Sequence, residues 1–240
     1  TYNVELNGDL KNVSSHLPSP LAKPAGEPLP VNVKVDGNLN SFDLTGQAGA
    51  DNHFNSRWLL GQKLTLDRAI WAADSKTLPP LPEQSGVELN MPPMNGAEWL
   101  ALFQKGAAES VGGAASFPQH ITLRTPMLSL GNQQWNNLSI VSQPTANGTL
   151  VEAQGREINA TLAMRNNAPW LANIKYLYYN PSVAKTRGDS TPSSPFPTAE
   201  RINFPGWPDA LIRCTESWIW GKKSGRIDSD ITIAGDTLTL

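Results

Sequence analysis

The 240-residue sequence has little charge, a single cysteine and no long hydrophobic run. Charged residues make up 17% of the chain, below the ~25% typical of soluble domains. The 19 basic and 21 acidic residues give a formal net charge of −2, and without clustered Lys and Arg we expect no nucleic-acid partner. Cys214 stands alone, so it excludes an internal disulfide and a cysteine-based metal cage. Apolar blocks such as Trp99 to Phe103 are much shorter than the ~18 residues of a transmembrane helix.

Catalytic signatures are equally scarce. His16, His53 and His120 lie in unrelated contexts, and the sequence contains no HExxH motif, no paired Cys/His spacing and no Gly-x-Ser-x-Gly elbow. Residues 221–225 resemble half of a phosphate-binding loop, but the first glycine of that motif is missing. We therefore expect a protein that is not an enzyme and that needs no metal and no cofactor.

Short runs in which apolar and polar residues alternate dominate the sequence, separated by 19 glycines and 20 prolines. Such runs predict half-buried β-strands. Because few helical segments separate them, we expect antiparallel meanders rather than βαβ units. The runs lie at 31–35, 64–71, 121–124, 138–141, 150–153, 158–164, 174–179, 211–220 and 227–233. Turn signals at 147–148 and 234–236 predict hairpins.

One segment predicts a short amphipathic helix, over residues 96–105. Asn95 is suited to cap it, and Glu98 follows three residues later, as in a capping box. Trp99 and Phe103 fall on one face of this helix. We expect the helix to cover one side of the sheet.

Two further segments interrupt the strand pattern. Residues 17–30 hold five prolines, which predicts an extended segment that crosses the sheet. Residues 181–200 are polar and predict a surface loop. The eight tryptophans have three interpretations from the sequence: core residues, flat platforms for sugars, or the lining of a surface that handles lipid.

Several segments together resemble the internal region of the AsmA-like proteins. They are Leu17–Gly26 with the strand after Leu29-Pro30-Val31, Ile158 through Trp170 to Leu177, Phe204–Asp209, and Ile212 through Trp218 and Gly225 to Leu240. The resemblance covers most of the chain and rests on the order and spacing of these segments.

This resemblance implies a bridge-like lipid transfer protein of a bacterium with two membranes. The expected fold is mostly β, an elongated antiparallel sheet curled into an open hydrophobic groove. The full-length protein would be anchored in the inner membrane by an N-terminal helix outside this sequence and would cross the periplasm. It would carry phospholipids between the inner and outer membranes and support outer-membrane homeostasis and the permeability barrier. The family offers no catalytic residue set to carry over.

The expected organisation is a single fragment of a longer repeating groove. Its approximate modules are 1–115, 116–180 and 201–240, with the loop 181–200 between the last two. Both ends of the sequence fall within alternating runs, so we expect unpaired strand edges through which an isolated fragment self-associates.

The residues themselves are consistent with a groove for acyl chains. Moving a phospholipid through water exposes about 30 methylenes at roughly 0.8 kcal/mol each, on the order of 25 kcal/mol. A continuous apolar trough removes most of this barrier. The candidates for the trough are Val31, Val33, Val35, Leu64, Leu66, Ile70, Ile121, Leu123, Leu138, Ile140, Ile158, Leu162, Met164, Ile227, Ile231 and Ile233. Arg68 continues the spacing of Leu64 and Leu66, either at a rim beside a lipid headgroup or as the charged end of the apolar zone in an ion pair.

Two other interpretations fit the same residues. A carbohydrate-binding β-sandwich would use some tryptophans as stacking platforms, with asparagines bonding to the sugar hydroxyls. A structural spacer would seal the apolar side chains inside a closed core, since a sandwich core produces the same alternation. The tertiary structure must decide whether the apolar face is open.

Overall fold

The computed structural model describes residues 1–101, 115–181, 208–234 and 237–239. Several expected features lie outside these ranges. They are the loop 181–200 apart from its first residue, the helix beyond residue 101, and turn residues 235 and 236.

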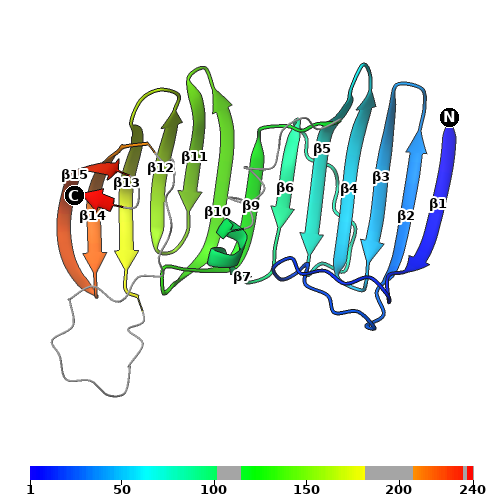
Figure 1. Ribbon diagram of the computed structural model, residues 1–240, viewed down its shortest axis with the longest axis horizontal. Helices are drawn as coiled ribbons and strands as arrows, with labels where there is room; N and C mark the ends of the chain where they lie inside the picture. The colour runs from blue at the N-terminus through cyan, green and yellow to red at the C-terminus, as the bar shows by residue number, and fades with distance from the viewer. Residues whose placement is uncertain (102–114, 182–207, 235–236, 240) are drawn as a thin grey trace.

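The described residues form one long mixed sheet that is mostly antiparallel (Figure 1). Fourteen strands follow one another in the order β1-β2-β3-β4-β5-β6-β9-β10-β11-β12-β13-β14-β15-β16, with β7 beside β9 and β8 beside β5. Their bounds are β1 Tyr2–Asp9, β2 Pro30–Gly37, β3 Ser41–Ala48, β4 Asn52–Leu60, β5 Leu64–Ala73, β6 Gly86–Asn90, β7 Met94–Asn95, β8 Ala115–Ser116, β9 Ile121–Leu130, β10 Gln133–Thr145, β11 Gly148–Gln154, β12 Ile158–Arg165, β13 Trp170–Tyr179, β14 Ala210–Ile219, β15 Lys222–Ala234 and β16 Thr237–Thr239.

All of the strands predicted from alternation are present, and the hairpin at 147–148 joins β10 to β11. The expectation of antiparallel neighbours is confirmed within β1–β5 and β9–β13. It is wrong at three junctions along the main strand order, because β5/β6, β6/β9 and β13/β14 are parallel. A parallel neighbour requires the chain to leave the sheet and return to the same end, and the alternation of side chains carries no information about this direction.

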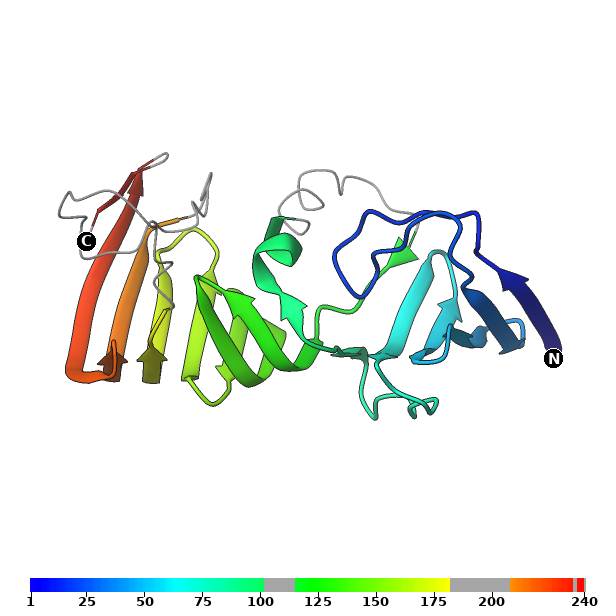
Figure 2. The same ribbon diagram turned by 90° about the horizontal axis from the view of Figure 1, so that it is seen from below.

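The sheet is essentially a single layer with local covers (Figure 2). The accessible surface of the whole chain is 15,892 Å², whereas a compact monomer of this mass exposes about 10,500 Å². The β1–β2 connection, residues 10–29, and the short helix lie on one side of the sheet, and the β5–β6 connection lies on the other (Figure 2). We call residues 10–29 the strap.

Strand pairing divides the side chains into two faces, because partners in register point to the same side. We call the side that carries Val31, Val33 and Val35 the apolar face. The side that carries Asn32 and Lys34 is the polar face. Following the register from strand to strand extends both faces across the sheet.

The predicted helix is confirmed over its described residues, 96–101. Asn95 Oδ1 accepts hydrogen bonds from the backbone N–H of Ala97 at 3.1 Å and of Glu98 at 3.4 Å. Asn95 Nδ2 donates to Glu98 Oε1 at 3.1 Å, so the Asn–Glu pair satisfies the open helix end as the sequence predicts. Beside the helix lies the core cluster of Ala73, Met91, Met94, Leu128 and Leu138, against which Trp99 packs.

A β-bulge at Asp67 corrects two of the sequence predictions. Arg57 pairs with Arg68, but Trp58 pairs with Leu66, which leaves Asp67 as an extra residue. An extra residue reverses the alternation on its far side. Leu64 and Leu66 therefore lie on the apolar face, whereas Arg68 and Ile70 lie on the polar face.

Candidate functional site

The apolar face is continuous and uncharged across most of the sheet. In strands β1–β6 and β9–β12, every position that the register places on this face is uncharged. The strands achieve this because uncharged residues, chiefly Val, Leu, Ile, Phe, Trp and small residues, occupy the alternate positions on this face. A surface of this kind offers no favourable partner to a charged ligand and a large contact area to an aliphatic one.

Most of the predicted groove residues lie together on this face. They are Val31, Val33, Val35, Leu64, Leu66, Ile121, Leu123, Leu138, Ile140, Ile158, Leu162, Met164 and Ile227. The backbone of Ile231 pairs with that of Ala210, and the backbone of Ile233 pairs with that of Leu238.

The predicted residues on the apolar face are mostly half-buried. Leu66 and Leu138 are buried, at 7% and 5% exposure, whereas Ile121 is 40% exposed. The others with described side chains are intermediate. A sealed sandwich core would bury all of them, so this face differs from that expected of a closed spacer.

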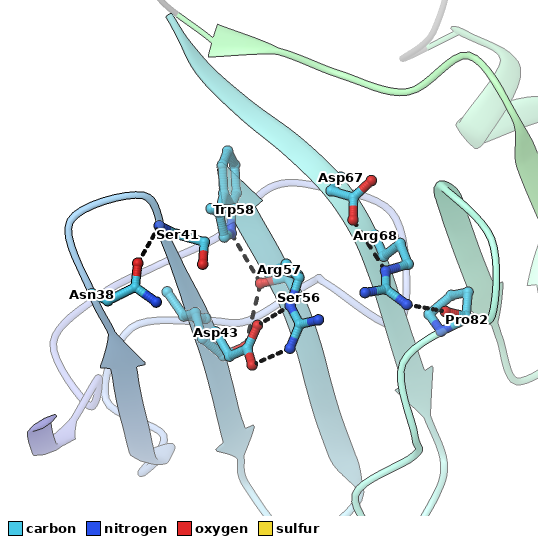
Figure 3. A network of polar contacts seen from close by, with 10 residues as sticks. Asn38, Ser41, Asp43, Ser56, Arg57, Trp58, Asp67, Arg68 and Pro82 are labelled. Carbon is cyan, nitrogen blue, oxygen red and sulfur yellow. Dashed lines mark hydrogen bonds and ion pairs between the residues drawn. The ribbon is translucent and has the colours of Figure 1, made fainter. Parts of the chain in front are cut away.

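Ile70 and Arg68 lie on the other side of the sheet, beneath the β5–β6 connection. Ile70 is 6% exposed, and its cross-strand neighbour Asn55 donates from Nδ2 to the carbonyl oxygen of Pro79 at 3.1 Å. Arg68 Nη1 donates to the carbonyl oxygen of Pro82 at 3.2 Å, and Arg68 Nε pairs with Asp67 Oδ2 at 3.1 Å (Figure 3). Arg68 therefore forms an ion pair and anchors this connection on the polar face.

Charged side chains gather on the polar face, where they pair with one another. Arg57 grips Asp43 on the neighbouring strand through two hydrogen bonds of 2.7 Å, from Nε to Oδ1 and from Nη2 to Oδ2 (Figure 3). These bonds lower the pKa of the Asp43 carboxyl below its ordinary value and raise the pKa of Arg57. Arg124 and Glu88 form a second pair at 3.0 Å. The polar face is thus adapted to water.

Towards the C-terminal end, the pKa values of two side chains are shifted by different causes. Cys214 is 2% exposed, and burial raises the pKa of its thiol, as is typical of a buried, unreactive cysteine. The pKa of Glu216 is lowered chiefly by the hydrogen bond from Trp218 Nε1, with a further contribution from the charge of Lys223. Glu216 and Trp218 lie on the polar face.

The strap is held above the apolar face by hydrogen bonds at its base and at its tip. At the base, Leu10 N donates to the Leu29 carbonyl oxygen at 2.9 Å, and Leu29 N donates to Asp9 Oδ1 at 2.8 Å. At the tip, Trp99 Nε1 of the helix donates to the Ser19 carbonyl oxygen at 3.0 Å. The proline-rich segment lies over the sheet and meets the helix. The prediction that it is extended is wrong, because it bends and turns at residues 17–21 and 25–27 and is folded back by the bridge between Ser15 and Lys23.

A cavity of about 370 Å³ lies between the strap and the apolar face. Its strap wall includes Pro20, Leu21, Pro28 and Leu29, with Lys23 and Glu27 as charged members. The sheet contributes Ala48, Asn52, Phe54 and Trp71. The cavity is thus mainly apolar, with a few polar groups.

Aromatic rings extend this apolar surface across β3–β5. Phe42 and Trp58 stack with their ring centroids 6.1 Å apart and their planes 8° from parallel. The edge of Phe117 meets Trp58 with the centroids 6.3 Å apart. The ring of Phe54 lies where a Cβ on Gly46 would fall, 2.2 Å from Phe54 Cζ, so only glycine leaves room for the ring at this place.

The sequence did not single out Asn52, Phe54 or Trp71 as cavity residues. The alternation of β3 and β4 is interrupted by Gly46 and Ser56 on the apolar face, which hides the strand signal. The only available signal for this part of the apolar face was that apolar residues occupy even positions, namely Phe42, Leu44, Ala48 and Phe54. Their proximity to the strap depends on tertiary structure.

The positions of five of the tryptophans do not favour stacking platforms for sugars. Trp58 and Trp71 lie on the apolar face, and Trp99 and Trp135 pack against the core cluster. Trp218 lies on the polar face, with Lys223 Nζ 5.9 Å from its ring centroid.

Within the described ranges, none of the helices is long and apolar enough to cross a membrane. The same ranges contain no group of three or more His, Cys, Asp or Glu residues arranged to hold a metal ion.

Comparison with known proteins identified a protein family and a relative. The model of a protein family described as "YhdP protein" matches residues 1–240. The intermembrane phospholipid transporter YhdP of Escherichia coli strain K12 is 95% identical over 240 residues, which are the whole of this chain and 19% of that relative. No solved structure matches the chain. The resemblance noted from the sequence extends to YhdP in particular, and these findings confirm it.

Proposed function

The chain belongs to the YhdP protein family, and we propose that it forms one stretch of a groove along which phospholipids travel between two membranes. In this proposal the acyl chains lie against the apolar face and the polar face is in water. The ligand is inferred from the E. coli relative, which is named an intermembrane phospholipid transporter. The site is inferred from the geometry of the sheet.

The observation that carries the proposal is the uncharged apolar face, which continues from β1 to β12 and stays half-buried along most of its length. An acyl chain on this face replaces water at each methylene, which is worth about 0.8 kcal/mol per methylene. Because neighbouring strands present similar surfaces, the acyl chain gains about as much binding free energy at one strand as at the next. It can therefore move along the sheet without a high barrier, and no cofactor or catalytic group is required.

The length of the sheet limits what this chain does alone. Fourteen strands at ~4.8 Å spacing extend roughly 60 Å, and the chain spans 19% of the length of the relative. We propose that other parts of the full-length protein continue the groove through the periplasm and anchor it in the inner membrane. Delivery to the outer membrane would then support the permeability barrier.

Photocrosslinking tests the groove at two places far apart in the sheet. The E. coli transporter is built with this chain in place of its matching residues. A photoreactive amino acid is placed at Val33 or Leu162 on the apolar face, with Asn32 or Thr161 as matched controls. Each control is the sequence neighbour of its test position, is half-buried to a similar degree and points to the opposite face.

We expect lipid adducts in cells at Val33 and Leu162 and few at Asn32 and Thr161. Equal labelling of both faces would contradict the groove, because it would mean that lipid meets the sheet without preference. No labelling at any of the four positions would contradict it as well.

The edge of the sheet supports a second, smaller part of the proposal. Among the described strands β1 pairs only with β2, and Tyr2, Val4 and Leu6 are 43%, 46% and 60% exposed. Free backbone groups beside exposed apolar side chains favour pairing with another strand. We propose that the isolated chain self-associates at this edge, which sedimentation at rising concentration would detect.

A further inference from the structure

The cavity beneath the strap is closed by a structure that is itself well fixed. Lys23 Nζ donates to the carbonyl oxygens of Val13 at 2.8 Å and Pro24 at 3.1 Å. Ser15 and Lys23 exchange two backbone hydrogen bonds, of 2.8 and 3.0 Å. With the bond from Trp99 to Ser19 at the tip, these contacts hold the strap in place over the apolar face. The cavity is therefore preformed, which lowers the cost of binding a ligand.

Asn52, one of the residues that line this cavity, has a side-chain oxygen without a hydrogen-bond partner among the described residues. Asn52 Oδ1 is buried and accepts no hydrogen bond from the described part of the chain. Asn52 is the first residue of β4, lies on the apolar face opposite Ala48 and Ala73, and lines the cavity. Burying an acceptor without a donor is unfavourable, and most buried polar groups in proteins are satisfied. This atom therefore points to a ligand that supplies a donor.

We propose that the cavity is a binding site for a phospholipid whose headgroup carries an N–H or O–H donor, with the donor on Asn52 Oδ1 and an acyl segment on Phe54 and Trp71. This inference rests on the proposed function and deepens it, because it assigns a holding site and a headgroup preference to one place on the apolar face.

The size and lining of the cavity fit this ligand. A cavity of ~150 Å³ binds benzene, so by proportion the 370 Å³ here accommodates on the order of 15 carbon atoms. The apolar floor takes the acyl segment, and Lys23 and Glu27 supply charge of both signs in the lining. An ethanolamine ammonium or a glycerol hydroxyl donates a hydrogen bond, whereas a choline headgroup has no donor.

A competition experiment tests this assignment. The full-length E. coli transporter carrying this chain is purified with a photoreactive amino acid at Trp71, inside the cavity. It is given vesicles that contain phosphatidylethanolamine and phosphatidylcholine in equal amounts with identical acyl chains, and the two adducts are counted by mass spectrometry. A second preparation carries the probe at Leu162, on the apolar face away from the strap.

We expect several-fold more phosphatidylethanolamine than phosphatidylcholine at Trp71 and a ratio near one at Leu162. Asn52→Leu removes the acceptor at similar size, and we expect it to bring the ratio at Trp71 to one while labelling at Leu162 persists. Asn52→Ala is the second variant, should the leucine disturb folding. Asn32→Leu, on the polar face, should leave the ratio unchanged.

The other possible outcomes of this experiment distinguish failure of the holding site, of the role of Asn52 and of the groove. Adducts at Leu162 with none at Trp71 would overturn the holding site and leave the groove intact. Equal labelling by both lipids at Trp71 in the unsubstituted chain, or a preference that persists in both Asn52 variants, would overturn the role of Asn52. The absence of adducts at both positions would overturn the groove itself, and the holding site with it.

Discussion

Phe54 lies directly over Gly46 of the neighbouring strand, so closely that a Cβ on Gly46 would be 2.2 Å from Phe54 Cζ. Phe54 lines the cavity beneath the strap, as does Trp71, its cross-strand partner. A glycine within a strand usually weakens it. Here the lost stabilisation is offset by the packing of an aromatic ring.

Gly46→Ala should therefore destabilise the chain by about 1–3 kcal/mol, the range for overpacking a well-packed site. The matched control is Gly8→Ala, on the same face of the edge strand, where an added Cβ meets nothing within 4 Å. It should stay within about 0.5 kcal/mol of the unsubstituted chain. Urea unfolding followed by tryptophan fluorescence measures both, and similar midpoints for the two variants would contradict the packing described for Phe54.

Deletion of Asp67 tests the bulge that reverses the two faces of β5. Without the extra residue, either Leu64 and Leu66 turn to the polar face or Arg68 turns to the apolar face. Taking Leu66 out of burial alone costs about 1.5–3 kcal/mol. Asp67→Ala keeps the extra residue and loses only a partly exposed ion pair, so it should cost less than about 1 kcal/mol. Thermal unfolding measures both variants. Equal melting temperatures for the deletion and for Asp67→Ala would contradict the role of the bulge.

The ion pair of Asp43 and Arg57 predicts a pH dependence of stability. Because the folded-state pKa of Asp43 is lowered, the stabilisation is complete above the unfolded pKa of ~3.9. It is lost as the pH falls through the lower, folded-state pKa. Asp43→Asn should thus lower the free energy of unfolding at pH 7, and the difference from the unsubstituted chain should shrink below about pH 4.

The size of this effect is modest, because the side chains of Arg57 and Asp43 are 38% and 34% exposed. We expect less than about 1 kcal/mol, reduced further by salt. Asp51→Asn, at an exposed turn residue, controls for the loss of one negative charge. A difference between Asp43→Asn and the unsubstituted chain that stays constant from pH 7 to pH 2 would show that the ion pair does not contribute.

Leu162→Asp places a charge in the proposed path of the acyl chains. Desolvating a carboxylate against aliphatic chains costs several kcal/mol, so passage should be slowed strongly while the half-buried position still permits folding. In cells that depend on the transporter carrying this chain, we expect greater sensitivity to large antibiotics that the outer membrane normally excludes. Thr161→Asp, on the polar face of the same strand, is the control and should behave as the unsubstituted chain. An intact barrier with a folded Leu162→Asp protein would count against the groove.

The sequence by itself determined which side chains share a face in most strands. Val31, Val33 and Val35 alternate with polar residues, and a strand turns successive side chains to opposite sides whatever it packs against. The helix cap at Asn95 could also be predicted, because the helix N-terminus and the Asn–Glu pair that caps it lie within four residues of one another. These are local relationships, and local chemistry fixes them.

Only the tertiary structure decided where the alternation of side chains between the two faces is interrupted and which segments cover the sheet. Ile70 and Arg68 changed face because the register between β4 and β5 slips at Asp67, and a slip depends on the partner strand. The parallel junctions and the position of the strap over Phe54 and Trp71 depend on long connections, whose paths alternation does not encode. An open face and a sealed core require the same alternating residues, so only the arrangement of the layers in space distinguishes a surface left for lipid from one closed by protein.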